Sequence, residues 1–343
     1  MTLDQARQMT GSEHRLRTGV VGTGHLGSLH AKMYSEIPAA VFVGAFDTDK
    51  AKCETVVSQY QNARSFSSLD ELLAGVDAVS VSTVTSQHFD VAKRALNAGV
   101  HVLIEKPITQ TVAEADELIA LAKAKGCTIQ VGHIERFNPA ILALESYNLR
   151  PMFIESHRLA QFNPRGTDVA VVLDLMIHDI DVILSLVKST VSRIDANGVA
   201  VVSDSADIAN ARLQFENGCV ANVTASRISQ NKMRKMRMFQ ANGYISIDFL
   251  QGLAEVFRLV EDGANVGQTT MLLGQIGEGK KKRNIVYEQP EVKDVNALKY
   301  EMESFVTAVR ENKEPVVSGV DGRLALDVAQ RIMNSIQVQK FGV

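Results

Sequence analysis

The sequence lacks the features that mark secreted, disulfide-rich and membrane-spanning proteins. Its three cysteines are isolated and odd in number, so they form no disulfide framework and no metal-binding spacing, and a reduced cytosolic compartment suits them. Residues 1–18 are polar and charged, without the apolar core of a secretory signal. No stretch is apolar for the length of a membrane span. We therefore expect a cytoplasmic protein with no membrane partner.

A strong charge of either sign is also absent. The formal net charge is −3 over 343 residues, which gives no reason to expect nucleic acid as a partner. The length allows two domains, and no internal repeat is present. Two short basic segments, 232–237 and 280–283, could bind a diphosphate-bearing substrate. A solvated strand face or a subunit edge is the favoured interpretation of both segments.

A glycine-rich turn near the N-terminus is the most informative motif. It lies between an apolar run, 19–21, and a helix-compatible stretch, 28–37, and a second apolar run ends at Asp47. This order of strand, glycine turn, helix, strand and acid is the dinucleotide fingerprint, with an ordinary glycine turn as the alternative. The N–H groups of such a helix N-terminus bind phosphates. The turn consists of Gly22, Thr23, Gly24, His25, Leu26 and Gly27.

Asp47 bears on the choice of cofactor. A carboxylate at the end of the second strand accepts hydrogen bonds from the adenosine ribose and repels a 2′-phosphate. No arginine follows directly, since the next residues are Thr48, Asp49 and Lys50. The sequence thus favours NAD over NADP. In the alternative interpretation, Asp47 only caps the next helix.

Strand and helix signals alternate from residue 17 to residue 133. Such alternation predicts an α/β fold with a doubly wound parallel sheet, a Rossmann domain that binds NAD over residues 15–133. Residues up to His14 are expected to form a loose tail or an extra helix. The expected strands after the fingerprint are 76–83, 100–104 and 128–132, and the expected helices are 89–98 and 112–125.

The pattern changes after His133. Several strand-like runs follow one another, with hairpin signals at 216–218 and 241–243, which predicts a mostly antiparallel sheet. We expect an α+β domain over 134–343 that binds substrate and forms the oligomer contacts. Residues 265–290 give no clear signal. The expected helices are 139–147, 173–187, 297–311 and 322–338, and the expected strands are 152–159, 193–202, 208–215, 219–228, 232–240, 244–249 and 254–259.

Lys106 follows a strand of the expected parallel sheet, within Glu105-Lys106-Pro107. Ligands of such sheets lie beyond the carboxyl ends of the strands, so Lys106 should point toward the nicotinamide position. The alternative is a solvated lysine in a turn.

The expected helix 173–187 is apolar nearly all round and therefore buried. A polar stripe nevertheless runs along it at helical spacing: Asp174, His178, Asp181 and Ser185. Burying such groups without partners is costly, so the stripe should line a cleft or a network. Asp174 and His178 lie one turn apart, and an imidazole suits the base that alcohol oxidation requires. The stripe could instead face water, or hold a metal; we expect none, because no second ligand cluster is apparent.

These motifs together resemble the glucose-fructose oxidoreductase/inositol dehydrogenase family (Gfo/Idh/MocA) over nearly the whole chain. The resemblance implies that Lys106 and His178 are catalytic, with Asp174 supporting His178. It also implies that Thr83, His88 and Glu105 contribute to the cofactor site. The family's usual glycines before Asp-x-x-x-His are replaced here by residues 169–173. The matching pieces are Gly22 to Gly27, Asp47, 79–83 followed by His88, 98–107, Asp174-x-x-x-His178 and 315–319.

Residues 132–139 and 173–181 further resemble the branch that contains UDP-N-acetylglucosamine 3-dehydrogenases. This implies NAD-dependent oxidation of a sugar 3-hydroxyl to a ketone, with Arg136, Arg158 and Arg165 as candidate contacts to substrate anions. A free-polyol or inositol-type dehydrogenase is the alternative, as is a non-catalytic NAD(H)-binding sensor. A homodimer or homotetramer is expected, because large apolar sheet faces are rarely exposed on monomers.

Overall fold

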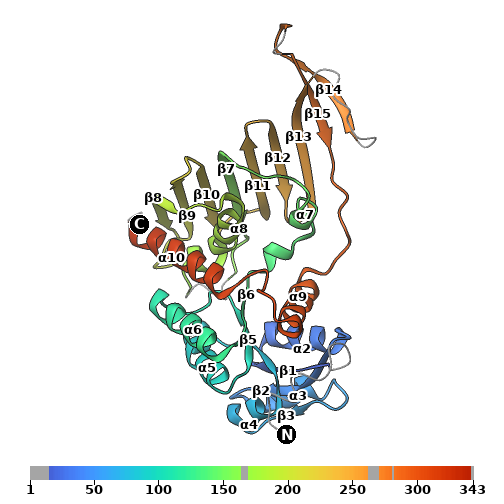
Figure 1. The fold of residues 1–343 in the computed structure, drawn as a ribbon. Helices are drawn as coiled ribbons and strands as arrows, with labels where there is room; N and C mark the ends of the chain where they lie inside the picture. The colour runs from blue at the N-terminus through green and yellow to red at the C-terminus, as the bar shows by residue number, and fades with distance from the viewer. Residues whose placement is uncertain (1–14, 164–168, 262–269, 280–281, 341–343) are drawn as a thin grey trace. The chain divides into compact units, whose positions relative to one another are not determined.

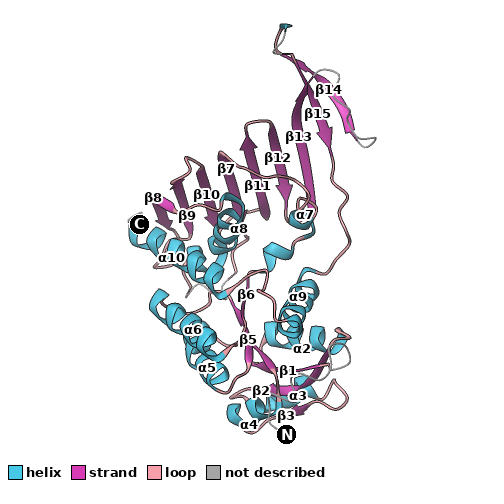
Figure 2. Ribbon diagram, in the orientation of Figure 1, coloured by secondary structure: helices cyan, strands magenta, loops and turns pink. Residues whose placement is uncertain are grey.

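The computed structural model describes residues 15–163, 169–261, 270–279 and 282–340, so the expected N-terminal tail lies outside the described residues. Figure 1 labels the elements and Figure 2 shows their type. The described residues form two compact units. The first comprises residues up to His133 together with Leu298–Arg323, and the second comprises Ile134–Ala297 with the residues from Leu324 onward.

The first unit is built on a parallel sheet, which confirms the predicted Rossmann fold. Its strand order is β3-β2-β1-β4-β5-β6, and the order reverses between β1 and β4, where ligands bind in such sheets. Consecutive strands are connected through helices, as parallel pairing requires. The strands are β1 (Leu16–Val21), β2 (Ala40–Phe46), β3 (Arg64–Ser65), β4 (Ala78–Val81), β5 (His101–Glu105) and β6 (Ile129–Gly132).

Capping residues set the ends of helices in this unit, as α6 illustrates. Thr111 and Glu114 form a reciprocal capping box at the start of α6, and Gly126 ends it in the left-handed conformation. Its bounds match the predicted helix, whereas α5 begins four residues before the predicted start at residue 89. The helices are α2 (His25–Glu36), α3 (Lys50–Val57), α4 (Leu69–Gly75), α5 (Thr85–Asn97), α6 (Val112–Lys125) and α9 (Ala297–Glu311).

Leu298–Arg323 belongs to the first unit, although the sequence analysis assigned it to the second domain. The physical reason is the buried face of α9. Met302 and Phe305 are fully buried, and they pack in the same apolar cluster as Val20 and Tyr34. The helix α10 (Gly319–Ser335) begins in this unit and continues in the second.

Ten strands of the second unit form one mostly antiparallel sheet, as predicted. Its order is β14-β15-β13-β12-β11-β7-β10-β9-β8-β16, with parallel pairing only for β7 with β10 and β8 with β16. Both expected hairpins join antiparallel neighbours. The strands are β7 (Phe153–Leu159), β8 (Val191–Ala200), β9 (Ile208–Phe215), β10 (Val220–Ser226), β11 (Met233–Gln240), β12 (Gly243–Asp248), β13 (Leu253–Glu261), β14 (Thr270–Ile276), β15 (Arg283–Glu288) and β16 (Gln337–Lys340).

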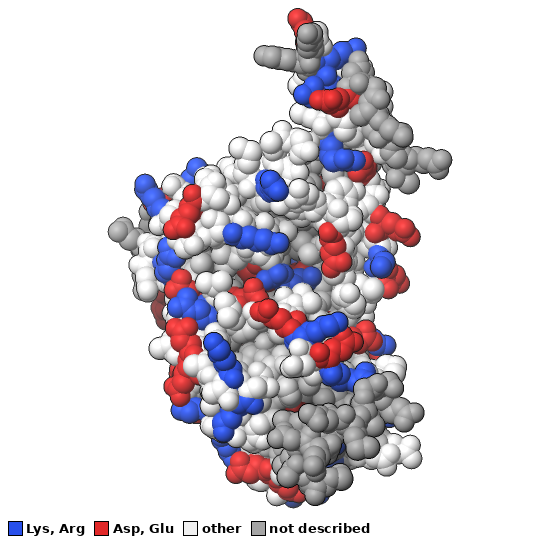
Figure 3. Space-filling view, viewed as in Figure 1, with Lys and Arg blue, Asp and Glu red and all other residues white. Residues whose placement is uncertain are grey.

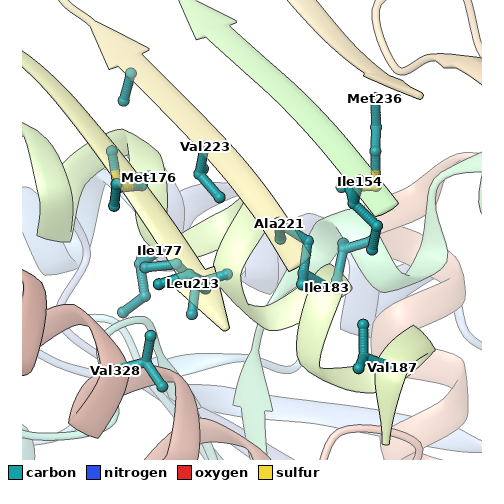
Figure 4. Packing of buried hydrophobic residues seen from close by; sticks show 14 of the residues in the cluster. Ile154, Met176, Ile177, Ile183, Val187, Leu213, Ala221, Val223, Met236 and Val328 are labelled. Atoms are coloured by element: carbon teal, nitrogen blue, oxygen red, sulfur yellow. The ribbon is translucent and has the colours of Figure 1, made fainter. Parts of the chain in front are cut away.

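Helices cover one face of this sheet. Figure 4 shows Ile177 and Ile183 of α8 (Ile177–Val187) among Leu213, Ala221 and other buried side chains of the strands. The predicted helix 139–147 is short, since α7 (Pro139–Leu142) ends at Leu142. The last predicted helix ends at Ser335 rather than residue 338, because the chain then pairs with β8 as β16.

Charge and hydropathy of the folded chain follow its composition. On the face drawn in Figure 3, acidic and basic side chains are interspersed. Across the described residues, no helix is both long enough and apolar enough to cross a membrane.

Candidate active site

The glycine turn connects β1 to α2 in the first unit. Gly22 has a φ of +89°, and a Cβ there would lie 2.8 Å from the Ser82 carbonyl oxygen, so only glycine fits. Gly24 caps α2 without any side-chain hydrogen bond. The first N–H groups of α2 are therefore available to an anion at the positive end of the helix dipole.

Gly24 and Gly27 have different surroundings. A Cβ on Gly24 would meet no atom within 4 Å, whereas one on Gly27 would lie 1.8 Å from the Gly22 carbonyl oxygen. A cavity of about 450 Å³ adjoins the turn and fits the nucleotide half of a dinucleotide. Its lining residues are Thr23, Gly24, His25, Ser28, Asp49, Ala51, Lys52, Thr55 and Val56.

Asp47 is tied to the glycine turn. Its Oδ2 accepts hydrogen bonds from the Thr23 N–H (2.6 Å) and the Thr23 hydroxyl (3.0 Å), and its Oδ1 accepts one from the Asp49 N–H (2.8 Å). Burial raises the pKa of Asp47, but these hydrogen bonds outweigh it and hold the pKa below its usual value. Asp49 caps α3 by accepting from the Lys52 N–H, so the alternative role of Asp47 as helix cap is wrong.

Glu105 turns inward at the end of β5. Its Oε1 lies 3.0 Å from Nε2 of His30, which is fully buried on α2, and its Oε2 accepts from the Lys106 N–H at 3.3 Å. Burial raises the pKa of Glu105, but His30 and then Lys106 lower it overall. Both carboxylate oxygens of Glu105 thus have partners inside the protein, and its cofactor contact stays a prediction. His30 was not predicted from the sequence, where its only signal is a lone histidine on a buried helix face.

His88 also supports the turns rather than contacting a ligand. It is 1% exposed, and its Nδ1 lies 2.9 Å from the Pro107 carbonyl oxygen and its Nε2 3.1 Å from that of Thr83. Burial lowers its pKa, against the effect of both carbonyls. His88 therefore joins the turns that follow β4 and β5, and it holds the turn that carries the half-buried Lys106. This corrects its expected place among the cofactor-binding residues.

Asp174 and His178 lie on two kinds of helix. Asp174 belongs to η2 (Val172–Met176), a π-helical turn, and His178 to α8, so the single α-helix predicted over 173–187 is wrong. A π turn bonds residue i to i+5, which shifts the side chains around the axis. Both residues are partly exposed, whereas Asp181 is buried and the Ser185 hydroxyl donates to the Val182 carbonyl oxygen. The predicted stripe therefore divides into an accessible part and a buried one.

The candidate substrate arginines are differently placed. Arg158 is 2% exposed, with Nε 2.6 Å from Asp179 Oδ2 and Nη1 2.8 Å from Glu135 Oε1, so its expected substrate contact is wrong. Arg136 Nε binds Asp181 Oδ2 at 2.8 Å and keeps a partly exposed side chain. Arg165 lies outside the described residues. Within the described residues, no group of three His, Cys, Asp or Glu side chains is arranged to hold a metal.

Three side chains of the first basic segment form ion pairs within the second unit. Arg234 pairs with Glu135 at 3.3 Å, Lys235 pairs with Asp248 at 3.2 Å, and Arg237 pairs with Glu155. This favours the interpretation as a strand face. In the second segment, residues 280 and 281 lie outside the described residues.

Comparisons with known proteins identify the class. Residues 16–133 match the oxidoreductase family with an NAD-binding Rossmann fold, and residues 142–246 match the Gfo/Idh/MocA C-terminal domain. The chain belongs to the Gfo/Idh/MocA family of NAD-dependent oxidoreductases. This confirms the predicted enzyme class, a dehydrogenase acting on CH–OH groups.

Among its relatives, the chain is 38% identical over 323 residues to UDP-N-acetylglucosamine 3-dehydrogenase from Acidithiobacillus ferrooxidans, covering 94% of this chain and 97% of that protein. A solved structure of the same name and organism superposes with a TM-score of 0.83 at 37% identity, covering 94% and 98% of the two chains. The chain is also 24% identical to scyllo-inositol 2-dehydrogenase (NAD(+)) from Bacillus subtilis over 344 residues, 95% of each protein.

Gly24 and Gly27 provide a matched test of whether the glycine turn, residues 22–27, binds the cofactor pyrophosphate. Gly24→Ala should leave the melting temperature unchanged, because its Cβ has open space. It should weaken NADH binding by about tenfold or more, because the added methyl group keeps the pyrophosphate from approaching the backbone N–H groups and so weakens a charge-assisted hydrogen bond. Gly27→Ala should lower the melting temperature, since its Cβ collides with backbone. Thermal unfolding measures the melting temperatures, and fluorescence titration measures the NADH affinities. An unchanged NADH affinity in Gly24→Ala would contradict pyrophosphate binding at the glycine turn.

Proposed function

We propose that this protein oxidises the 3-hydroxyl of UDP-N-acetylglucosamine to a ketone with NAD. The observation that carries the proposal is the 38% identity over 94% of the chain to an enzyme of that name. The family's motif residues Lys106, Asp174 and His178 all stand in this chain. A protein that only sensed NAD(H) would need none of the three.

The catalytic roles follow from the chemistry of each side chain. His178 takes the proton of the hydroxyl, Asp174 orients the imidazole, and Lys106 donates to the substrate oxygen and stabilises its developing negative charge. NAD, when bound, supplies the acceptor for the hydride that leaves the same carbon. Arg136 remains the candidate for an anion of the substrate.

The cofactor is held by the first unit. The N–H groups at the start of α2 bind the pyrophosphate, with the exposed His25 and Leu26 beside them. The Asp47 carboxylate is the proposed ribose contact, and it is held by Thr23 and Asp49, two residues that line the cavity. Such a fixed charge selects against a 2′-phosphate.

Cofactor choice tests this role of Asp47. The protein should bind NADH more tightly than NADPH, and Asp47→Ala should narrow the difference by removing the repulsion of the 2′-phosphate. Asp47→Asn, which is isosteric, separates the effect of charge from that of shape. Fluorescence titrations of the parent protein and both variants give the dissociation constants for NADH and NADPH. Tighter NADPH binding by the parent protein would rule out the ribose contact.

Turnover of UDP-N-acetylglucosamine with NAD tests the function itself. His178→Ala should lower kcat on the order of a hundredfold or more, the usual contribution of a positioned base, and should leave NADH binding intact. The oxidation rate should rise with pH, because only a neutral imidazole accepts the proton. Ser185→Ala is the control on the same helix, since its hydroxyl bonds only within α8.

The second candidate, a polyol dehydrogenase, is favoured by the full-length similarity to scyllo-inositol 2-dehydrogenase. The same assay separates the two functions. Turnover of scyllo-inositol without turnover of UDP-N-acetylglucosamine would replace the proposed substrate and retain the mechanism. Near-normal turnover by His178→Ala would reject the mechanism.

We also propose that the protein forms a homodimer or homotetramer through the uncovered face of its antiparallel sheet. Phe153 alternates with the buried Ile154 and so points to that face. It begins an aromatic ladder with ring centroids 4.9–6.0 Å apart, and Phe239 in this ladder is 39% exposed. The ladder consists of Phe153, Phe239, Tyr244, Phe257 and Tyr287.

Light scattering at micromolar concentration measures the assembly. The parent protein should be dimeric or tetrameric, and Phe239→Lys should weaken the association, since it places a charge in an apolar contact. Val316→Lys, at a more exposed apolar position of the first unit, should have no effect. A monomeric parent would contradict the proposal.

A further inference from the structure

A buried cluster of ion pairs adjoins His178 in the second unit. We propose that this cluster sets the rotation of α8 about its own axis and thereby aims the His178 imidazole. Arg158 and Asp179 are its positioning residues. The inference rests on the proposed role of His178 as the base, and it adds residues that act only through His178.

Arg158 and Asp179 form the centre of the cluster. The guanidinium binds the carboxylate through two N–H groups of one edge, with Nε 2.6 Å from Oδ2 and Nη2 3.3 Å from Oδ1. The Ser156 hydroxyl donates to the same Oδ1 at 2.8 Å. The side chains of Arg158 and Asp179 are 3% and 1% exposed. A planar two-point contact of this kind fixes direction as well as distance.

A second ion pair, between Asp181 and Arg136, holds α8 from another side. Asp181 Oδ2 lies 2.8 Å from Arg136 Nε, and the Asp181 side chain is 1% exposed. In an α-helix each residue advances by about 100° around the axis. Relative to His178, Asp179 therefore projects at about +100° and Asp181 at about −60°. His178 lies in the arc between the two anchored carboxylates.

Both carboxylates are connected to one short segment, Asp181 directly and Asp179 through Arg158 of β7. Arg136 is in η1 (Ile134–Phe137), and so is Glu135, whose Oε1 lies 2.8 Å from Arg158 Nη1. Glu135 Oε2 also accepts from the Asn138 amide at 3.0 Å. The segment η1 thus anchors α8 on both sides of His178, directly through Asp181 and through Arg158 to Asp179.

Stability alone does not account for this arrangement. Replacing a buried ion pair by apolar side chains of similar volume is often neutral or stabilising. The apolar side chains of α8 already bury it against the sheet, but apolar contacts are not directional. The ion pairs add what packing lacks, a defined rotation of the helix.

The decisive variant is Arg158→Met/Asp179→Leu, which removes the central pair without leaving either charge alone. Glu135 keeps its contacts to Asn138 and Arg234. We expect a folded protein with unchanged NADH affinity and a kcat lowered by about 10- to 100-fold, as small misplacements of a catalytic group produce. Arg193→Met/Asp195→Leu is the matched control, an exposed ion pair on β8 of the same unit, and its kcat should equal that of the parent.

Arg158→Lys tests the same idea where the double variant fails to fold. It keeps the buried charge but loses the fork, so kcat should fall while the KM for NAD stays unchanged. Rates are normalised to folded protein by the stoichiometry of NADH binding. A role confined to stability would lower the melting temperature without changing this normalised kcat. A folded double variant, or Arg158→Lys, with the parent's kcat would overturn the inference.

A second readout keeps the inference separate from the substrate assignment. In protein labelled with ¹³C-histidine, the His178 ring signal is assigned by its loss in His178→Ala. It should shift in both Arg158 variants and stay in place in the Arg193/Asp195 control. An unmoved ring signal in both Arg158 variants overturns the inference whatever the substrate is. A shifted signal, with His178→Ala fully active, would instead defeat the proposed function.

Discussion

Each buried carboxylate near the candidate site needs a cation or a hydrogen-bond donor as its partner. This requirement determines how the elements that carry the site are joined. A carboxylate removed from water costs several kcal/mol unless a cation or hydrogen-bond donor replaces its hydration. Glu105 meets His30, and Asp179 meets Arg158. In each pair the partners come from different elements, β5 with α2 and α8 with β7, so electrostatic compensation also aligns the elements.

The first unit uses this principle beneath the glycine turn. His30 and Tyr34 lie one turn apart on α2, and both are fully buried. His30 pairs with Glu105, while the Tyr34 hydroxyl lies 2.8 Å from the Ser80 hydroxyl on β4. The helix whose N-terminus is proposed to bind the pyrophosphate is therefore joined to β5, which ends one residue before Lys106. The glycine turn and the proposed catalytic lysine therefore share one support.

The candidate site was predictable where its signal is local. The glycine turn, Asp47 and Lys106 were identified because each depends on a short stretch of chain: a tight turn, a helix N-terminus, the end of a strand. Arg158 was misread as a substrate contact because a sequence shows that a residue is cationic, not that it is buried. Its partner Asp179 was overlooked because it lies beside the predicted stripe, off the helical spacing that defined it. The π turn at Asp174 was missed because spacing alone assumes a regular helix.

By itself, the sequence determined the elements and their class. The capped helix 112–125 and the strand 208–215 have the bounds that their own residues predict, because caps, turns and hydrophobic alternation act over a few residues. Tertiary structure alone decided that 298–323 completes the first unit and that β14 and β15 extend the sheet. It also decided which carboxylate meets which cation. These outcomes depend on burial and on partners distant in the chain, and neither is encoded in the local pattern.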